Sequence, residues 1–252
     1  MKNNGISTRL IIMNFLQYAI WGAYLTSMGS YLVNIGLGAK IGIFYAMQGI
    51  VSIFMPAIIG IIADKYIQAQ KVLSISQGLA GLFMIAAGFY GMTAGSNVSF
   101  GMLFTLYSLS VAFYMPTIAL SNSVAYSGLE KFGMDTVKAF PPIRVFGTVG
   151  FICSMLFVNF MKADGVQFQH SYNQFFTSGV LGLVLCLYSL TLPACPVSKS
   201  TASTSFVDVF GLRAFSLFKK KDMAIFFVFS MLLGVSLQIT NGFANPFITS
   251  FK

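Results

Sequence analysis

The stretch Gly60 to Lys71, GIIADKYIQAQK, places a short charged turn between two long apolar runs. Residues 41–62 precede the turn and residues 72–93 follow it, and Asp64 and Lys65 lie between them. Each run is close to the ~20 apolar residues that a helix needs to cross the ~30 Å hydrocarbon core of a bilayer. The pattern therefore predicts two consecutive membrane-spanning helices joined by a tight turn.

The same pattern recurs along the chain. Its 252 residues are 56% hydrophobic and only 8% charged, whereas roughly a quarter of the residues in a soluble domain are charged. No water-soluble core can absorb that much apolar surface. We predict an all-α integral membrane protein, surrounded by a lipid bilayer, with spans near residues 10–33, 41–62, 72–93, 101–125, 140–161, 173–192 and 223–247.

The charged and reactive residues exclude several classes of function. The net charge is +9, but the Lys and Arg residues lie in short connections and not in a basic stripe with exposed aromatics, so we expect no nucleic-acid partner. The three cysteines have no metal-ligand spacing, and His170 is the only histidine. We therefore expect no metal site and no cofactor. No nucleophile and base are paired in a way that favours an enzyme.

The basic residues also predict the orientation in the membrane. If the N-terminus is cytoplasmic, eleven Lys and Arg residues fall in inside segments: Lys2, Arg9, Lys65, Lys71, Lys131, Lys138, Lys199, Arg213, Lys219, Lys220 and Lys221. The outside segments then hold Lys40, Lys162 and Lys252. Because Lys and Arg are enriched in cytoplasmic loops, the N-terminus is expected inside the cell.

The spacing of the spans indicates two blocks. Residues 1–192 are predicted to form a six-helix N-terminal bundle. Residues 193–222 form a cytoplasmic loop that contains SKSTASTS (Ser198 to Ser205) and an expected amphipathic helix from Phe206 to Phe218. Residues 223–252 then supply the first helix of a C-terminal bundle. Two six-helix halves joined by a long loop are typical of one large class of secondary transporters.

Several stretches of the sequence indicate which group of secondary transporters the chain resembles. The turn Gly60 to Lys71 resembles the loop signature of the major facilitator superfamily, which implies a major-facilitator-type helical bundle. In that signature Gly60 would permit close helix packing, and Asp64 would accept hydrogen bonds from a neighbouring helix end. Longer strings resemble the bacterial nucleoside:proton symporters of that superfamily: FLQYAIWGAYLTSMGSYL (15–32), FMPAIIGIIADK (54–65), FPPIRVFGTVGFI (140–152) and MAIFFVFSMLLGVSLQITNGFANPF (223–247).

The resemblance implies a function. Members of this family bind a nucleoside between the two halves, near the middle of the bacterial inner membrane. They carry it by symport with alternating access, and the proton is the coupling ion. The resemblance covers the chain from its first span to its end, but family members have twelve spans and this sequence has seven.

One face of the fifth span carries three residues suited to a nucleoside. Arg144, Thr148 and Phe151 recur at i, i+4 and i+7, which places a cation, a hydroxyl and a ring on one arc of the helix. Arg and Thr donate hydrogen bonds to sugar and base oxygens, and a flat base stacks on an aromatic ring. Arg144 could instead extend to the cytoplasmic interface. The resemblance assigns the matching Arg, Thr and Phe to substrate contact.

The seventh span carries amides. Gly234, Gln238, Asn241 and Asn245 recur on one face, and Gln238 and Asn241 can both donate to and accept from a neutral substrate. The alternative is hydrogen bonding between helices. Two weaker polar stripes are further candidates for cavity lining: Asn14, Gln17, Trp21 and Tyr24 on the first span, and Ser110, Tyr114, Thr117 and Ser121 on the fourth.

The acidic residues are placed unusually for a proton symporter. All six are expected in loops or at span ends: Asp64, Glu130, Asp135, Asp164, Asp208 and Asp222. The resemblance places the proton-carrying acid in the C-terminal half, so we expect this chain to be a truncated product or fragment whose missing C-terminal half is an implied partner. Two alternatives stay open: a transporter of another neutral polar solute such as a sugar, and a membrane fragment that does not transport.

Overall fold

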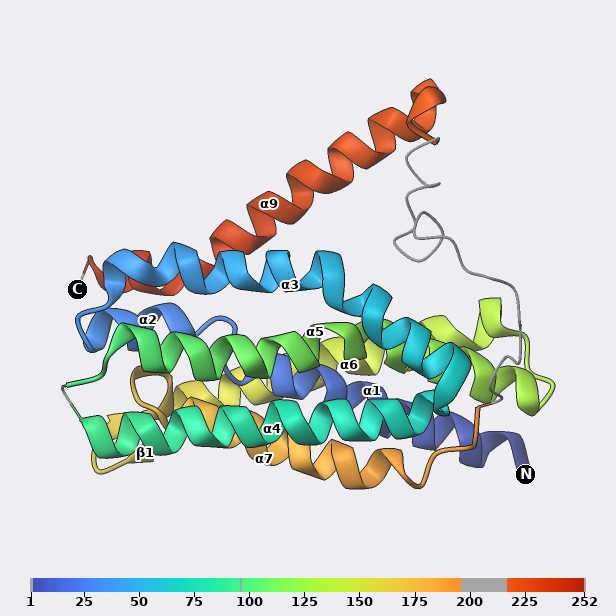
Figure 1. Ribbon diagram of the computed structural model, residues 1–252, viewed down its shortest axis with the longest axis horizontal. Helices are drawn as coiled ribbons and strands as arrows, with labels where there is room; N and C mark the ends of the chain where they lie inside the picture. Colours follow the sequence, from blue (N-terminus) through green and yellow to red (C-terminus); the bar gives the residue numbers. More distant parts are fainter. Residues whose placement is uncertain (1, 96, 196–216, 252) are drawn as a thin grey trace.

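The computed structural model describes residues 2–95, 97–195 and 217–251, and it is almost entirely helical (Figure 1). The helices are α1 (Lys2–Gly22), α2 (Met28–Asn34), α3 (Ile41–Ile61), α4 (Ala69–Ala94), α5 (Phe100–Lys131), α6 (Thr136–Phe160), α7 (Asn173–Ser189) and α9 (Lys221–Thr249). Shorter elements are the 3-10 turns η1 (Gly38–Lys40) and η3 (Phe168–His170), the π-helical turn η2 (Ile62–Tyr66), and the paired strands β1 (Lys162–Ala163) and β2 (Val166–Gln167).

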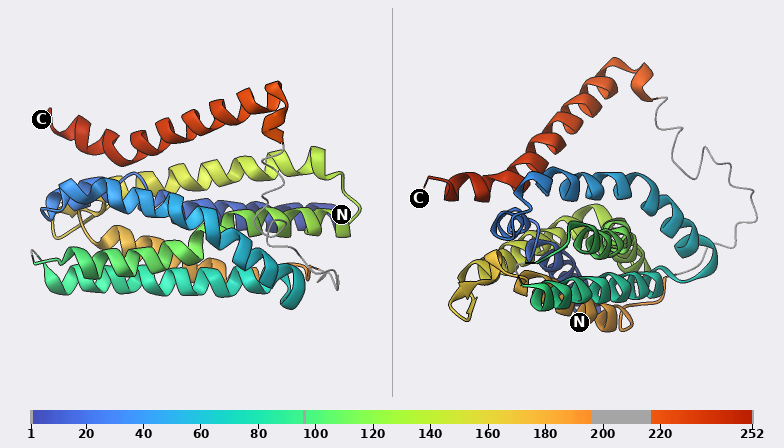
Figure 2. Two further views of the ribbon diagram at one scale, coloured as in Figure 1. Left: turned by 45° about the horizontal axis from the view of Figure 1, so that its top comes forward. Right: turned by 60° about the vertical axis from the view of Figure 1, so that its left-hand side comes forward.

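Helices α1 to α7 form one bundle, and α9 lies on its outside. Within the bundle α1 packs on α6 and α7, α4 packs on α5 and α7, and α3 packs on α5. Helix α9 packs on α2 and α3 near its C-terminal end and diverges from the bundle toward its N-terminal end, as Figures 1 and 2 show. This arrangement leaves α9 with almost no buried residues.

Five helical segments of the described chain are long and apolar enough to cross a membrane: 38–66, 69–94, 100–131, 136–160 and 221–249. They correspond to five of the seven predicted spans. Of the other two, α7 has only 17 continuous residues. The single helix expected over residues 10–33 is wrong at its C-terminal end, because α1 stops at Gly22 and turns separate it from α2.

Side chains supply hydrogen bonds where the first span breaks. The Tyr45 hydroxyl of α3 donates to the Leu25 carbonyl. The Ser27 hydroxyl lies 2.9 Å from Gln174 Oε1 on α7 and 3.3 Å from the Ala23 carbonyl oxygen. A break at membrane depth is tolerated only where protein groups replace the lost helical hydrogen bonds. These tertiary contacts explain why the chain bends here without a proline.

Glycines set the distance between α1 and α6. A Cβ atom on Gly22 would overlap the backbone of Phe151, and a Cβ atom on Gly150 would overlap the backbone of Phe15. Small residues allow membrane helices to approach to backbone contact, where packing replaces the missing hydrophobic driving force. The reciprocal pair therefore fixes α6 against α1 at the level of Phe151.

Among the residues that the structure describes, Gly60 and Asp64 in the turn after α3 do not make the close helix packing and the helix-end contacts that were expected of them. A Cβ atom on Gly60 would meet no atom within 4 Å, so this glycine does not serve close packing. Asp64 is exposed and has no ion-pair partner in the described part of the chain. Gly234 of α9 is likewise open, and it is Gly242 that approaches a neighbour, the ring of Tyr45.

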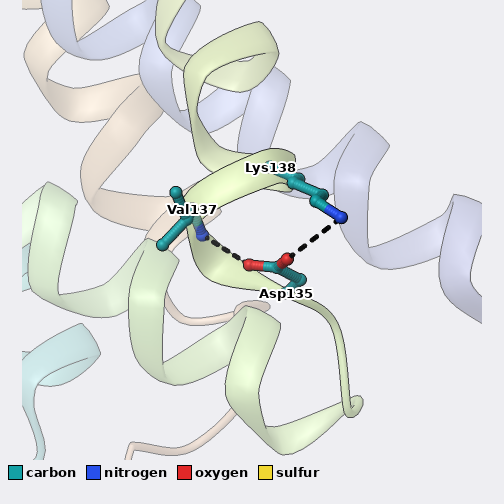
Figure 3. Close-up of polar contacts among 3 residues, drawn as sticks. All are labelled: Asp135, Val137 and Lys138. Atoms are coloured by element: carbon teal, nitrogen blue, oxygen red, sulfur yellow. Dashed lines mark hydrogen bonds and ion pairs between the residues drawn. The ribbon is translucent and has the colours of Figure 1, made fainter.

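The start of α6 is capped. The Asp135 side chain accepts a hydrogen bond from the Val137 backbone N–H at 3.0 Å and lies 3.9 Å from Lys138 Nζ (Figure 3). Such a cap stabilises a helix by about 1 kcal/mol, whereas the ion pair is exposed and contributes little. The cap thus fixes the beginning of the helix that carries Arg144.

Part of the predicted loop cannot be compared. The SKSTASTS stretch and most of the amphipathic helix expected over residues 206–218 lie outside the described residues. Pro56, Pro116 and Pro246 lie inside helices α3, α5 and α9, respectively. Figure 1 shows α3 and α9 bent along their length, as expected where proline removes a helical hydrogen bond.

The close approach of α1 and α6 leads to a stability prediction. Gly150→Ala should lower the thermal stability of the detergent-purified protein, because overpacking costs about 1–3 kcal/mol. Gly49→Ala is the control, since a Cβ atom there meets no atom within 4 Å and alanine is the better helix former by about 1 kcal/mol. Equal melting temperatures for the two variants would contradict this account.

Candidate functional site

The predicted face of α6 lies against α1. The Arg144 guanidinium carbon lies 3.8 Å from the centroid of the Tyr18 ring, which is cation–π geometry. The Phe151 ring stands edge-on to the Trp21 ring, with 6.3 Å between centroids and 86° between planes. Thr148 is exposed on the same helix. The guanidinium is therefore held over an aromatic ring on α1, which argues against free extension to the interface.

The amides of α9 have different partners. Asn245 Nδ2 donates to Gln169 Oε1 at 3.0 Å, so Asn245 connects α9 to η3. The Tyr45 hydroxyl donates to the backbone carbonyl oxygen of Asn241 at 3.4 Å, a contact that does not involve the Asn241 side chain. The Nε2 atom of Gln238 is buried and has no hydrogen-bond partner among the described residues. An unsatisfied buried donor costs about 1–3 kcal/mol, so Gln238 offers a group that an additional acceptor would stabilise.

A cavity of about 300 Å³ separates α9 from the break after α1, the C-terminal end of α6 and η3. Of the five predicted binding residues only Asn241 lines it. Its other polar lining residues include Thr26, Asn159, Gln169 and Asn245. Arg144, Thr148 and Phe151 precede the part of α6 that lines the cavity, which begins at Met155. The structure therefore does not gather the five predicted residues in one closed pocket.

Asn159 is a lining residue that the sequence analysis missed. It lies eleven residues after Thr148, and a helix with 3.6 residues per turn returns to nearly the same face after eleven residues. The continuation of the Arg144, Thr148 and Phe151 arc was therefore the signal that could have found it. Gln169 lies in a loop, where no periodicity could indicate its position beside Asn245.

The two weaker stripes are mostly buried in the bundle. Gln77 Nε2 donates to Gln17 Oε1 at 2.8 Å, and both amides reach the Thr117 hydroxyl at 2.8 Å. The Tyr114 hydroxyl donates to the backbone carbonyl oxygen of Gln17 at 2.6 Å. All four side chains are at most 1% exposed. They join α1, α4 and α5 and do not line the cavity. Gln77 is a polar core residue that the sequence analysis did not single out.

The described acidic residues lie at the ends of helices and in the hairpin: Asp64 in η2, Glu130 in the last turn of α5, Asp135 at the cap of α6, Asp164 beside β1 and Asp222 in the first turn of α9. Asp208 lies outside the described residues.

Partial burial lowers the pKa of the His170 imidazole below its usual 6.5, so this side chain is mainly neutral at pH 7. Among the described residues, no three His, Cys, Asp or Glu side chains cluster as metal ligands would.

Comparison with known proteins identifies relatives along the whole chain. The nucleoside H+ symporter family matches residues 4–252. The xanthosine permease of Escherichia coli (strain K12) is 46% identical over 250 residues, which are 98% of this chain and 56% of the permease. The nucleoside permease NupG of the same organism is 42% identical over 248 residues, again 98% and 56% of the two chains.

A solved structure agrees with the fold. The crystal structure of a mutant of nucleoside transporter NupG matches this chain with a TM-score of 0.84 and 42% identity, covering 98% of this chain and 59% of the other. The chain therefore spans little more than half the length of these relatives. Because the family matches nearly every residue and the helical bundle matches a solved transporter, the chain belongs to the nucleoside H+ symporter family.

Proposed function

We propose that the protein carries nucleosides across the bacterial inner membrane by proton-coupled symport with alternating access. The observation that carries this proposal is the family match over residues 4–252. The names of the relatives, a xanthosine permease and a nucleoside permease, support a nucleoside as the substrate. The activity is proposed for the complete transporter, because this chain corresponds to 56% of each relative.

The domain layout follows from the same relatives. We propose that residues 1–192 form the N-terminal bundle, that residues 193–222 form a cytoplasmic loop, and that residues 223–252 begin the second bundle. The position of α9 on the outside of the bundle supports this division. A C-terminal half, corresponding to the additional length of the relatives, would complete the site and supply a carboxylate at membrane depth for the proton.

The proposed binding residues are Arg144, Thr148 and Phe151 on α6, and Gln238 and Asn241 on α9. Arg144 and Thr148 donate hydrogen bonds to ribose and base oxygens, and Phe151 offers a ring to the base. The buried, unpaired Nε2 of Gln238 supports its role, because a substrate acceptor would satisfy it. Amides can read a neutral substrate without a balancing charge.

A competition experiment tests the substrate class. We expect unlabelled nucleosides to suppress uptake of radiolabelled uridine by cells that express the complete transporter, and sugars without a base to leave it unchanged. Sugars bring no flat ring to Phe151, which is the physical reason for this difference. Equal suppression by sugars and nucleosides would favour the alternative substrate, and absence of uridine uptake would favour a protein that does not transport.

Arg144 gives a sharper prediction. Charge-assisted hydrogen bonds contribute about 1.5–3 kcal/mol, so Arg144→Ala should weaken uridine binding ~10–150-fold. Arg144→Lys should also be impaired, because lysine lacks the planar fork of donors, and Thr148→Ala should be affected less. Calorimetry on the purified transporter gives these affinities.

Lys138→Ala is the matched control for Arg144. This basic side chain also lies on α6 but is 87% exposed, so its loss should not change uridine affinity. If Arg144 only extended to the interface, Arg144→Lys would behave like the wild type, since lysine reaches the interface equally well. That result would remove Arg144 from the site.

We also propose that the N-terminus is cytoplasmic. In Figure 1 the turn between α3 and α4, the turn between α5 and α6 and the start of α9 lie toward the same end as the N-terminus, and this is where Lys65, Lys71, Lys131 and Lys138 are found. Lys162 lies in the hairpin at the other end. The enrichment of basic residues at one end supports its placement in the cytoplasm.

Cysteine labelling tests this orientation. In a background without native cysteines, Val166→Cys in the hairpin should react with an impermeant maleimide on intact cells, whereas Val137→Cys should react only after the membrane is opened. Val137 and Val166 are 80% and 45% exposed, so both positions are accessible to the probe. The reverse labelling pattern would place the N-terminus outside.

A further inference from the structure

Trp21 stands apart from the other residues of its stripe. Asn14, Gln17 and Tyr24 are fully buried, whereas Trp21 is partly exposed. It is also the only tryptophan of the chain. Its ring contacts Phe151 of the proposed binding face, so an aromatic surface continues from α6 onto α1.

The rings around Trp21 are held at fixed angles. The planes of Trp21 and Phe151 are nearly perpendicular at 86°, and the Tyr114 ring lies behind Trp21 at 6.5 Å between centroids. Tyr114 is only 1% exposed, and its hydroxyl donates to the backbone carbonyl of Gln17, so its ring is held in place. A flat base that lies on one of two perpendicular rings meets the other edge-on, and both arrangements are favourable for aromatic pairs.

Gln48 determines the plane of the indole. Its Oε1 atom accepts a hydrogen bond from Trp21 Nε1 at 3.3 Å, and its Nε2 atom donates to the Tyr107 hydroxyl at 2.7 Å. Gln48 is 4% exposed and Tyr107 is fully buried. Because an indole N–H can only donate, the amide oxygen of Gln48 must face Trp21 and its nitrogen must face Tyr107.

We propose that Trp21 is a base-stacking residue of the nucleoside site, and that Gln48 is a positioning residue that holds the indole plane parallel to the bound base. This inference rests on the proposed function and adds the substrate feature that the site selects, which is a planar base. With its N–H already bonded to Gln48, the indole offers the substrate an aromatic face and no donor. Recognition through Trp21 is therefore stacking, and the hydrogen bonds come from α6 and α9.

The test compares two nucleosides that differ in planarity. Uridine has a flat base, whereas 5,6-dihydrouridine keeps the same carbonyl and N–H groups on a puckered ring. Base stacking on an aromatic side chain corresponds to about 5- to 150-fold in affinity, so the wild-type transporter should prefer uridine. Trp21→Leu should reduce this preference at least about threefold, and Trp21→Phe should retain part of it.

Phe146→Leu is the control for loss of a ring. Phe146 lies on α6 and is 42% exposed, so its replacement should leave both affinities unchanged. Melting temperatures of all variants establish that each one is folded. If Trp21→Leu does not fold, Trp21→Phe tests the stacking role and the Gln48 variants test the positioning role.

Gln48 is tested by fluorescence as well as by affinity. Bound uridine should quench the part of the complete transporter's emission that comes from Trp21, which is the part that Trp21→Phe removes. Gln48→Met keeps the length of the side chain but removes the acceptor, so quenching and uridine preference should both decrease. Gln48→Glu restores an oxygen acceptor for the indole N–H and should recover both. Recovery distinguishes positioning of the ring from a general loss of packing.

The outcomes separate this inference from the function on which it rests. Failure of the wild-type transporter to bind any nucleoside would overturn the proposed function and this inference with it. Normal uridine binding with an unchanged preference in folded Trp21→Leu, or in Trp21→Phe where the leucine variant does not fold, would overturn the stacking role alone. Wild-type quenching and preference in Gln48→Met would overturn the positioning role of Gln48.

Discussion

The structure depends on one constraint, which is that polar groups inside the hydrocarbon region must find partners within the protein. Continuous helices satisfy the backbone, and the break after α1 occurs only where other side chains take over. There the Tyr45 hydroxyl bonds the Leu25 carbonyl, and Ser27 is bonded to Gln174. The same break forms one side of the cavity that faces α9, so the constraint that shapes the helix also shapes the candidate site.

Buried amides divide into two groups under this constraint. Gln17 and Gln77 bond each other and Thr117, and together they join three helices of the bundle. Gln238 instead keeps a buried donor without a partner in the described chain. The hydrogen bonds of Gln17 and Gln77 stabilise the bundle, although the Oε1 atom of Gln77 has no partner among the described residues. The donor of Gln238 differs in its position, because it lies on α9, outside the bundle, where a group that binds during function would satisfy it.

Hydropathy predicted the membrane class and most span positions, because these depend on local composition, whereas the family was predicted from the resemblance of longer sequence strings. The break at residues 23–27 could not be predicted, since it contains no proline and depends on Tyr45, a residue of another helix. Glycine positions were also ambiguous: Gly60 was expected to pack closely and does not, whereas Gly22, Gly150 and Gly242 do. Sequence shows that a residue is small, but only the fold shows which face meets a neighbour.

The contact of α9 with the bundle shows how the two could separate at low cost. Pro246 cannot donate to the carbonyl four residues earlier, which belongs to Gly242, and this carbonyl faces Gly29 of α2 at backbone contact. The pair Asn245 and Gln169 adds one neutral hydrogen bond nearby. No ion pair joins α9 to the bundle within the described residues. Movement of α9 at this end therefore breaks packing and a neutral hydrogen bond, neither of which depends strongly on salt. The proposed alternating access would not require the separation of charges here.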